Sequence, residues 1–498
     1  MTAPFHGLPI REDPESHYDA VVIGAGVGGL ICANLLAASG MKVLMVEQHY
    51  VVGGYCSSFV RKKYKFDAAS HFYPLLGNPQ TITGKLLGKL GVETKWAKMD
   101  PVDHFNFPDG SRYSVPADFD RYLEDLLRMF PHEESALKAF FQEVRALNLL
   151  GLLSYFHGKE VDRLRKHEHR SLAEALDGYF TDEKLKLLLT ADCPHWGSPP
   201  KRISYVFDSM LRLSYFLGNY YPKGGSQAFS DDLAYAFKRA GGTTVMRARA
   251  RKILVENDKV AGVELELGTP SNRRLVRVNS PVVVSNADLL QTSEFLLGEE
   301  LVGKEYLDGL RGIRRSFPCY LMHIGLKDTS LEELDAPQGY HWDTWNADDL
   351  GTEALRFKFF VPTMYDSSIA PKGGQIVIIQ KVIDCDFEGM EDWPAHKDRI
   401  DRFVQGHLEN LVPGFAERVE VQMSASAMTS HRYTLNQGGA MLGWEMSPDQ
   451  LGMQRPGVEG PVEGLFYCGH WTRPGGGITP VIVSAMQAAG KVTGERYF

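Results

Sequence analysis

The sequence contains few cysteines, and they are not spaced to bind a metal. Six cysteines are spread over 498 residues, and no two of them form a C-x-x-C pair. This usage is typical of a reducing compartment and argues against a cysteine-based metal site. No Ser-His-Asp or Cys-His pattern and no other metal-ligand spacing rises above chance. The sequence therefore predicts no bound metal.

Positive charge is also scarce. The formal net charge is −8 and the isoelectric point is near 6.1, which argues against nucleic acid as a partner. The N-terminal segment has no basic region followed by an apolar one, so no signal peptide is expected. Glu12, Asp13 and Glu15 do not suit a transit peptide, because such peptides are poor in acidic residues. These absences predict a cytoplasmic protein.

The chain has no long apolar run that suits a membrane span. Residues 20–41 carry no charged side chain, but glycine and β-branched residues fill the first half of this stretch. Asn34, Ser39 and Gly40 interrupt the second half, whereas a span needs about 20 predominantly apolar helical residues. The sequence also shows no repeat, low-complexity tract or flexible linker. Its 498 residues are too many for one core, so two interleaved domains are expected.

Residues 18–55 have the layout of a dinucleotide-binding unit. A buried strand is predicted at 20–23, and three glycines follow it at G-x-G-x-x-G spacing. A helix over about 27–39 comes next, and its N-terminal N–H groups would face phosphates. A second strand at 42–46 ends in an acid at the offset where a carboxylate binds a ribose. The predicted cofactor contacts are Gly24, Gly26, Gly28, Gly29 and Glu47.

A second glycine pair, Gly53 and Gly54, follows directly after the acid, where nicotinamide-binding units usually continue into a helix. In the amine-oxidase-like flavoproteins such a pair lies under the phosphates and ribityl chain of FAD, and the sequence resembles them from Tyr18 onward. More narrowly, it resembles the carotenoid desaturase, carotenoid isomerase and retinol saturase family. The resemblance implies FAD as cofactor and an α/β fold, with a Rossmann-like FAD-binding domain and an interleaved α+β substrate domain.

The most family-specific motif stands near the end of the chain. Residues 464–469 are predicted to form a short buried strand, which runs into HWTRPGGGITP and then into a helix over about 480–491. A helix N-terminus directed at the flavin would stabilise its reduced, negatively charged form by about 0.3–2 kcal/mol. The motif and the N-terminal unit are predicted to hold opposite ends of one FAD. The resemblance assigns cofactor contacts here to Gly469, His470, Gly477, Ile478 and Thr479.

Shorter stretches add to the resemblance. Asp67 matches the aspartate of a Phe-Asp step in the family and is expected to be a structural hydrogen-bonding residue. In the family, the strand predicted here at 246–255 packs on adenine, and Ala250 stands at the place of its usual valine. The remaining matches are the turns at 197–200 and 221–225, the strand at 282–288 and the loop at 366–374.

The family architecture assigns residues 1–78, 221–290 and 436–498 to the FAD-binding domain, and 79–220 and 291–435 to the substrate-binding domain. In the substrate domain, apolar residues at three and four spacing predict helices over 118–130, 133–156 and 171–189, and a further helix is predicted over 398–410. Strands are predicted at 318–326 and 375–381. Residues 196–221 include seven aromatic side chains, a density that fits the wall of an apolar substrate cavity.

Residues 146–156 are apolar on nearly all sides. Basic side chains follow them, so the stretch is a candidate for peripheral contact with a bilayer surface. The alternative is a buried core helix with a solvated charged tail, which we favour because 11 residues are too few to span a membrane. The basic residues are Lys159, Arg163, Arg165, Lys166 and Arg170.

Three functions remain open at this point. The resemblance favours an FAD-dependent oxidoreductase acting on an apolar conjugated substrate, as a carotenoid desaturase or isomerase does, with His71 in a segment that approaches the flavin ring. An oxidase of aromatic or allylic alcohols is the alternative enzyme, with His470, His431 and Tyr433 as candidates to accept a hydroxyl proton. A non-catalytic binder of prenylated proteins, like the Rab GDP-dissociation inhibitors, shares the architecture, but the flavin-side C-terminal motif argues against it.

Overall fold

A five-stranded parallel sheet carries the cofactor-binding motifs. The computed structural model describes residues 13–156, 161–269, 271–351, 356–385 and 387–497. The strand order is β10-β2-β1-β14-β20, and every neighbouring pair is parallel. Both faces of this sheet are covered, which explains the continuous apolar run in its central strand. The strands are β1 Ala20–Ile23, β2 Val43–Glu47, β10 Thr243–Met246, β14 Val283–Ser285 and β20 Leu465–Tyr467.

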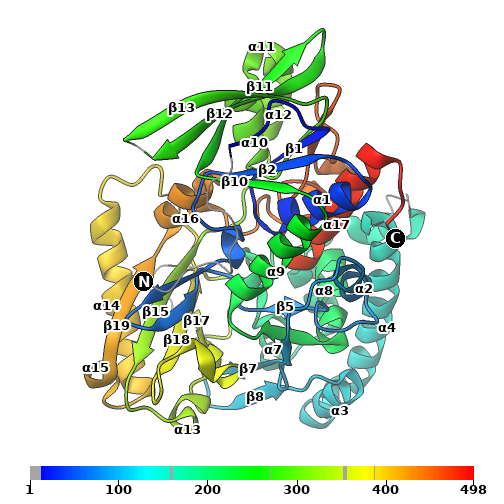
Figure 1. Ribbon diagram of the computed structural model, residues 1–498. Coiled ribbons are helices and arrows are strands. Elements are labelled where there is room, and N and C mark those ends of the chain that lie inside the picture. The colour runs from blue at the N-terminus through cyan, green and yellow to red at the C-terminus, as the bar shows by residue number, and fades with distance from the viewer. Residues whose placement is uncertain (1–12, 157–160, 270, 352–355, 386, 498) are drawn as a thin grey trace.

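Helices and a second small sheet cover the two faces (Figure 1). On one face lie α1 Val27–Ala38, α9 Ser226–Arg239 and α17 Ile478–Thr493, which share a core with the parallel strands. On the other face lies an antiparallel meander of β11 Ala248–Glu256, β12 Lys259–Thr269 and β13 Asn272–Asn279. The short helices α10 Leu289–Gln291, α11 Glu299–Val302 and α12 Lys304–Arg311 border this meander.

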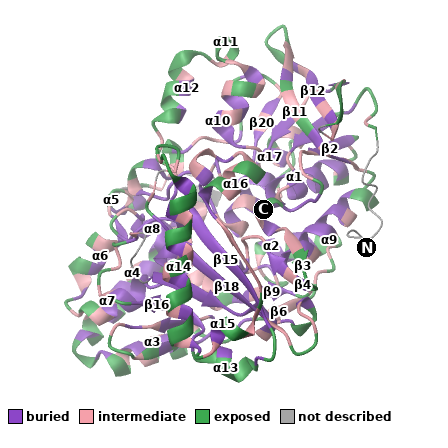
Figure 2. Cartoon of the chain, turned by 90° about the vertical axis from the view of Figure 1, so that its left-hand side faces the viewer, coloured by how far each residue is buried: buried purple, intermediate pink, exposed green. Residues whose placement is uncertain are grey.

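A seven-stranded mixed sheet organises the other half of the molecule, with the order β19-β15-β18-β17-β16-β7-β8. The long helix α14, Trp393–Leu411, lies across one face, and its exposed side faces solvent (Figure 2). Helices from the first half of the chain pack on the opposite face. The strands are β7 Asp103–Asn106, β8 Arg112–Val115, β15 Cys319–Leu326, β16 Gly339–Trp342, β17 Arg356–Phe360, β18 Gln375–Val382 and β19 Val419–Ala425.

The remaining elements are two small sheets and a set of mostly short helices. One small sheet pairs β3 Ser58–Arg61 with β4 Tyr64–Asp67, and another joins β5 Tyr73–Pro74, β9 Asn219–Pro222 and β6 Trp96–Lys98. The helices are α2 Ile82–Lys89, α3 Phe119–Met129, α4 Glu134–Gly151, α5 Arg165–Glu168, α6 Leu172–Tyr179, α7 Glu183–Thr190, α8 Tyr205–Ser214, α13 Leu331–Asp335, α15 Phe415–Arg418 and α16 Ala427–Thr434.

Several predicted elements differ from the observed ones. The single helix expected over 171–189 is two helices, α6 and α7, because the Asp182 side chain caps a new helix by accepting a hydrogen bond from Leu185 N. The strand expected over 246–255 is broken at Arg247, whose φ of 54° separates β10 from β11. The helix expected over 133–156 is α-helical only to Gly151 and continues as a π-helical turn over Leu152–Phe156.

The predicted fold class is confirmed. The parallel sheet takes its strands from three separate segments of the chain, and the seven-stranded sheet takes its strands from the stretches between them. In particular, β7 pairs with β16 although more than 200 residues separate them in sequence, and β8 pairs with β7 at the edge of the sheet. The domain boundaries stay a prediction.

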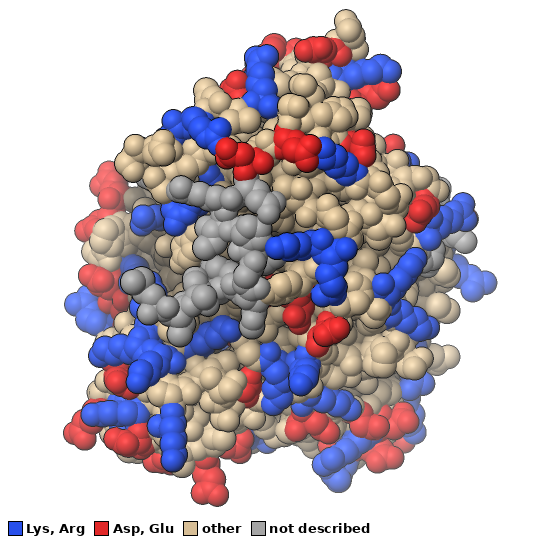
Figure 3. All heavy atoms as spheres, in the orientation of Figure 1, with Lys and Arg blue, Asp and Glu red and all other residues tan. Residues whose placement is uncertain are grey.

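None of the helices in the described residues is long and apolar enough to cross a membrane. Residues 146–154 are buried only in part. Leu147 is buried against the core, whereas 60% of Leu149 is exposed. Lys159 lies outside the described residues. On the face shown in Figure 3, basic and acidic side chains are interspersed.

Candidate cofactor and substrate site

The glycines after β1 form a tight cradle around the side chain of Asn286. A Cβ atom on Gly28 would lie 2.4 Å from Asn286 Oδ1, and one on Gly26 would lie 3.0 Å from Asn286 Nδ2. A Cβ atom on Gly29 would lie 2.0 Å from the carbonyl oxygen of Gly24, so the helix start and the strand end are in direct contact. Gly24 itself has a φ of 92°, which favours glycine.

Glu47 and the second glycine pair close the same loop. Glu47 Oε2 accepts a hydrogen bond from Ala25 N at 2.8 Å, and Oε1 accepts one from His49 N at 2.8 Å. Burial raises the pKa of the Glu47 carboxyl, and the N–H donors oppose this shift. Gly53 N donates to Ala25 O at 2.7 Å, and Gly53 has a φ of 114°. Gly54 follows with a φ of 57°.

The C-terminal motif lies directly beside this cradle. The Cβ position of Gly28 is 3.3 Å from Gly469 Cα and 3.0 Å from Val481 Cγ1, in the first turns of α17. A Cβ atom on Gly469 would itself lie 2.8 Å from Asn286 Oδ1. Thr479 Oγ1 donates to Pro74 O at 3.1 Å, which ties the start of α17 to β5. The two motifs from opposite ends of the chain therefore lie side by side, and that they hold one cofactor stays a prediction.

Both helices that border the cradle begin in a way that suits an anionic ligand. α1 starts after Gly26 and α17 after Gly477, and neither N-cap makes a side-chain hydrogen bond. Neither helix has an acidic residue in its first turn, where Ile478 and Thr479 open α17. Free N–H groups and the positive end of a helix dipole attract phosphate and other anions. The residues present thus fit a dinucleotide held between two helix N-termini.

His470 lies at the wall of this region. Its ring is 6.2 Å from the ring of Tyr55 and 5.1 Å from that of Trp471, between centroids. Burial lowers the pKa of His470 to about 3, and the charge of Arg455 adds to this shift. Tyr55 Oη donates to Ala440 O and accepts from Asn436 Nδ2, both at 3.1 Å. His470 is therefore neutral at physiological pH.

His71 belongs to a different, fully buried cluster. Its Nδ1 lies 3.0 Å from Ala69 O, while Nε2 has no hydrogen-bond partner in the described residues. The ring centroid is 4.5 Å from that of Phe360 and 5.7 Å from that of His195. Burial holds the pKa of His71 well below its usual range, and the nearby positive charge of Lys358 contributes. His71 is thus an uncharged group within the substrate half.

Lys358 is the charged centre of that cluster. Its Nζ pairs with Asp103 Oδ2 at 2.6 Å and lies over three rings, 4.9 Å from the centroid of Tyr340, 5.1 Å from that of Phe72 and 5.7 Å from that of Phe360. Cation–π contacts of this kind help to hold a buried ammonium group. The pair joins β17 to β7.

The other predicted residues lie elsewhere. Tyr433 is 53% exposed, and its ring is 5.4 Å from that of His49, close to the end of β2. His431 is half-buried in α16, and its Nδ1 lies 2.9 Å from Asn436 O. Neither belongs to the buried cluster around His71. Ala250 is half-buried in β11, opposite Leu265 of β12. Their proposed roles stay predictions.

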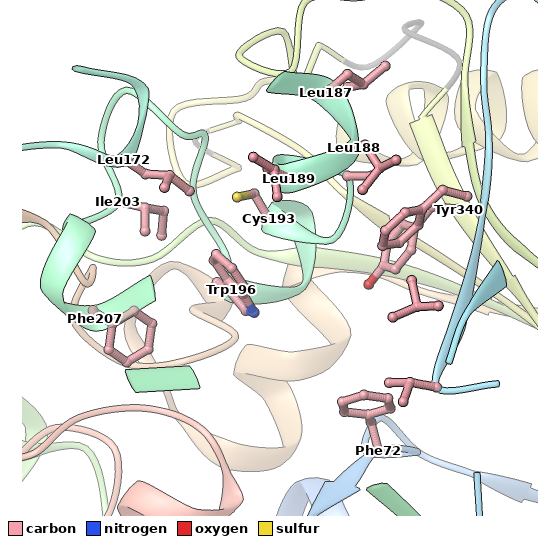
Figure 4. Close-up of a cluster of buried hydrophobic side chains, with 14 of the residues drawn as sticks. Phe72, Leu172, Leu187, Leu188, Leu189, Cys193, Trp196, Ile203, Phe207 and Tyr340 are labelled. Atoms are coloured by element: carbon pink, nitrogen blue, oxygen red, sulfur yellow. The ribbon is translucent and has the colours of Figure 1, made fainter. Parts of the chain in front are cut away.

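A small cavity of about 30 Å³ lies among the aromatic side chains of the substrate half. Trp196, Tyr215 and Phe216, from the predicted aromatic stretch, line it together with Phe72, which directly follows His71. Figure 4 shows Trp196 and Phe72 in the buried cluster, below the leucines of α7. We expected an apolar wall, but three charged residues also line the cavity. The remaining lining residues are Val102, Asp103, Phe105, Val115, Tyr122, Leu188, Asp192 and Arg212.

The cavity and the cofactor cradle belong to one continuous structure. Met441, Leu442 and Met446 pack against the same core as the cavity walls. Two of these residues also contact the glycine-rich turn before α17. A Cβ atom on Gly475 would lie 2.3 Å from Met446 Cε, and one on Gly476 would lie 2.4 Å from Leu442 O. Leu442 and Met446 therefore contact both the glycine-rich turn before α17 and the large apolar core to which the cavity walls belong.

Fold and site together define a two-domain FAD-binding oxidoreductase. The family described as flavin containing amine oxidoreductase matches residues 27–493, and the chain belongs to this family. FAD is the cofactor, and when bound it supplies a reversible hydride acceptor.

Two relatives and one solved structure illustrate the relationship. The chain is 25% identical to the chloroplastic prolycopene isomerase of Daucus carota, with 96% of this chain and 80% of the relative covered. It is 30% identical to the all-trans-retinol 13,14-reductase of Macaca fascicularis, with 91% and 82% covered. Putrescine oxidase bound to putrescine matches in fold alone, with a TM-score of 0.68, 14% identity, and 97% and 100% of the two chains covered.

Sequence reasoning missed four residues of the site. Asn286 stands in a stretch that was predicted as a strand end, but nothing in the sequence shows that its side chain fills the glycine cradle. Lys358 and Asp192 lie far apart in segments that carry no motif, and Arg212 lies inside the aromatic stretch 196–221, where the sequence predicted a cavity wall but no charge.

Proposed function

We propose that the protein is an FAD-dependent oxidoreductase that acts on an apolar conjugated polyene. The observation that carries this proposal is the aromatic cavity, whose walls belong to the same apolar core as Leu442 and Met446, the two residues that contact the flavin-side turn of the C-terminal motif. The similarity to prolycopene isomerase and all-trans-retinol 13,14-reductase over most of the chain supports the same substrate class. Both named activities concern long conjugated molecules.

The side chains assign a binding and orienting role to the protein. Phe72, Trp196 and Tyr215 offer flat apolar faces that suit a rigid conjugated chain. Tyr215 and Trp196 are fixed relative to each other, because Trp196 Nε1 donates to Tyr215 Oη at 2.9 Å. His71 and His470 are both neutral, so neither of them adds a charge to this region. A conjugated chain itself delocalises the charge that develops on it, so a catalytic acid–base pair is not required.

An oxidase of small alcohols would need a base at the flavin, and two of the three candidates, Tyr433 and His470, do not suit this role. Tyr433 is exposed at the surface, and His470 has a pKa of about 3 because it is buried. A base of that pKa is a poor acceptor for a hydroxyl proton near neutral pH. The polyene reaction therefore fits the side chains better than alcohol oxidation.

The test is a product analysis with purified FAD-loaded protein. Poly-cis carotenoid and all-trans-retinol are incubated anaerobically with the oxidised and with the chemically reduced protein, and products are separated by chromatography. We expect a new polyene isomer or a product changed by two hydrogens in at least one of the four reactions. Peroxide formation with aromatic alcohols in air, together with no change in any polyene, would contradict the proposal.

We also propose a cytoplasmic protein that contacts membranes from the outside, where apolar polyenes dissolve. Leu149 is 60% exposed on α4, and Arg163 and Lys166 are exposed shortly after it. An exposed leucine beside basic residues suits an anionic lipid surface. In a flotation assay with vesicles containing phosphatidylserine, the protein should float and L149E should float less. Equal recovery of both proteins in the unbound fraction would contradict this.

A further inference from the structure

One arginine beside the C-terminal motif is fully buried and has no acidic partner. Arg455 is 1% exposed, and among the described residues no carboxylate oxygen lies within 4.0 Å of its guanidinium nitrogens. Glu445, whose backbone it contacts, pairs instead with Arg202 at 2.7 Å and with Arg314 at 3.2 Å. Arg455 therefore brings an uncompensated positive charge into the interior, which is costly unless something else offsets it.

Neutral carbonyl oxygens hold the guanidinium group in place. Nη2 donates to Trp444 O at 2.8 Å and to His470 O at 3.1 Å, and Nη1 donates to Glu445 O at 3.3 Å. Nε has no hydrogen-bond partner in the part of the chain that the structure describes. Burial lowers the pKa of Arg455 to about 9, so the group is still charged at neutral pH. The carbonyl contacts fix its position but leave its net charge in place.

The charge lies directly beside the glycine-rich turn before α17. A Cβ atom on Gly475 would lie 3.4 Å from Arg455 Cζ. Through the contact with His470 O, the same guanidinium group also reaches the first part of the motif. Its field acts there as well, because the Arg455 charge contributes to the lowered pKa of the His470 ring. Arg455 thus adjoins the segment that is predicted to contact the flavin end of FAD.

FAD is the cofactor of this family, and its two ends respond differently to such a charge. The pyrophosphate carries the same negative charge in the oxidised and in the reduced cofactor. The flavin ring is neutral when oxidised, and it carries a negative charge near N1 and the C2 carbonyl after it takes up two electrons and one proton. A buried cation near the ring therefore stabilises the reduced form selectively, since the interior screens its charge weakly. The N-terminus of α17 acts in the same direction.

We propose that Arg455 raises the reduction potential of the bound flavin by stabilising the negative charge of its reduced form from beside the turn 475–477. The proton that accompanies the two electrons goes to N5, and N1 stays unprotonated. Arg455 acts at a distance and takes no direct part in hydride transfer. The inference rests on FAD and not on the identity of the substrate, so its failure would leave the polyene proposal standing.

The first test measures the midpoint potential of the bound flavin by anaerobic titration with dithionite in the presence of a reference dye. R455Q removes the charge and should lower the affinity for reduced FAD relative to oxidised FAD at least roughly tenfold, a fall of about 30 mV for a two-electron couple. R455K keeps the charge and should stay within roughly threefold of the native ratio. R356Q is the matched control and should keep the native potential, because Arg356 is 3% exposed but is paired with Asp343 and Asp349.

A second pair of variants keeps Arg455 and changes only the charge beside it. Met446 is fully buried, and its Sδ lies 3.3 Å from Arg455 Nη1. M446E places a carboxylate within reach of the guanidinium group, whereas M446Q has nearly the same size and no charge. The ratio of reduced to oxidised FAD affinity should be at least roughly tenfold lower in M446E than in M446Q. This pair decides the question if R455Q loses its fold or its flavin, which melting temperature and flavin content report.

The native protein also gives a result without any variant. Its dithionite-reduced flavin should show the near-ultraviolet absorbance of the anionic form at pH 6 as well as at pH 8, and conversion to the neutral reduced form across this range would overturn the proposal. So would a potential in R455K as low as in R455Q, or equal potentials in M446E and M446Q. A native potential in folded R455Q, with weaker binding of both FAD forms, would overturn it as well and would assign Arg455 to the pyrophosphate instead.

Discussion

Gly29 has no room for a side chain, because a Cβ atom there would lie 2.0 Å from the carbonyl oxygen of Gly24. In G29A, either α1 or the end of β1 must move, and we expect a loss of about 1–3 kcal/mol in unfolding free energy. The cradle for FAD moves with them. The ratio of flavin absorbance to protein absorbance after purification should therefore fall at least roughly fivefold. A loss of about 1.4 kcal/mol in binding free energy would weaken FAD binding tenfold.

Gly406 provides the matched control for this prediction. It lies inside α14, and a Cβ atom there would meet nothing within 4 Å. G406A should keep the native flavin content and raise the unfolding free energy by about 0.5–1 kcal/mol, since glycine is a poor helix former. Similar flavin contents in G29A and G406A would show that the glycine cradle does not hold the cofactor.

His323 makes stability depend on pH in a defined direction. Burial lowers its pKa to about 4, although its Nε2 lies 2.9 Å from Asp67 O. Between pH 6.5 and 4 the unfolded chain takes up a proton at this residue and the folded protein does not, so falling pH reduces stability. The unfolding free energy falls by about 1.4 kcal/mol per pH unit in this range, and the effect levels off below pH 4.

Urea unfolding of the native protein and H323Q at pH 8, 6.5 and 5 measures this contribution. At pH 8 the difference between the two proteins is the packing cost alone, because histidine is neutral in both states. From pH 6.5 to 5 the native protein should lose about 2 kcal/mol more than H323Q does. Parallel pH profiles of the two proteins would contradict the buried, neutral state of His323.

At the scale of elements, the Lys358–Asp103 pair joins β17 to β7 inside the seven-stranded sheet. The two side chains are only 2% and 11% exposed, and removing one charge leaves the other buried without its partner. We expect D103N to lower the unfolding free energy by about 3–5 kcal/mol. The double variant D103L/K358M should recover most of this loss, because it buries no charge.

A surface pair controls for the loss of an aspartate in general. Asp109 pairs with Lys184 at 2.6 Å, with 41% and 30% of the side chains exposed. D109N should therefore cost only about 0–1 kcal/mol. Chemical denaturation of the four proteins tests this, and equal losses in D103N and D109N would show that the buried pair does not couple the two strands.

The elements that the sequence predicts well are those whose signals are local. β1, α1 and β2 follow from an apolar run, a glycine spacing and an acid within one continuous stretch. Helix ends set by side chains are harder, as Asp182 shows. Its capping of α7 breaks a pattern that otherwise suits one helix through 171–189.

At the scale of the whole molecule, predictability falls with the sequence distance of the contacts. The two glycine motifs were predicted to share one cofactor only because the family resemblance links them, since 440 residues separate Gly29 from Gly469. No resemblance or sequence spacing links Asp103, Asp192 and Lys358. These residues come close together because of the strand order in the seven-stranded sheet and the way helices pack on it. The cofactor motifs could therefore be predicted from the sequence, whereas the charged residues of the cavity wall could not.

The central claim is that the two ends of the chain hold a single FAD between the N-termini of α1 and α17. A crystal structure of the FAD-loaded protein measures this most directly. We predict one FAD per chain, with its pyrophosphate at Gly26–Gly29 and its isoalloxazine ring at Gly477–Thr479. An FAD that contacts only one of these two helix N-termini, or that binds elsewhere, would contradict the account.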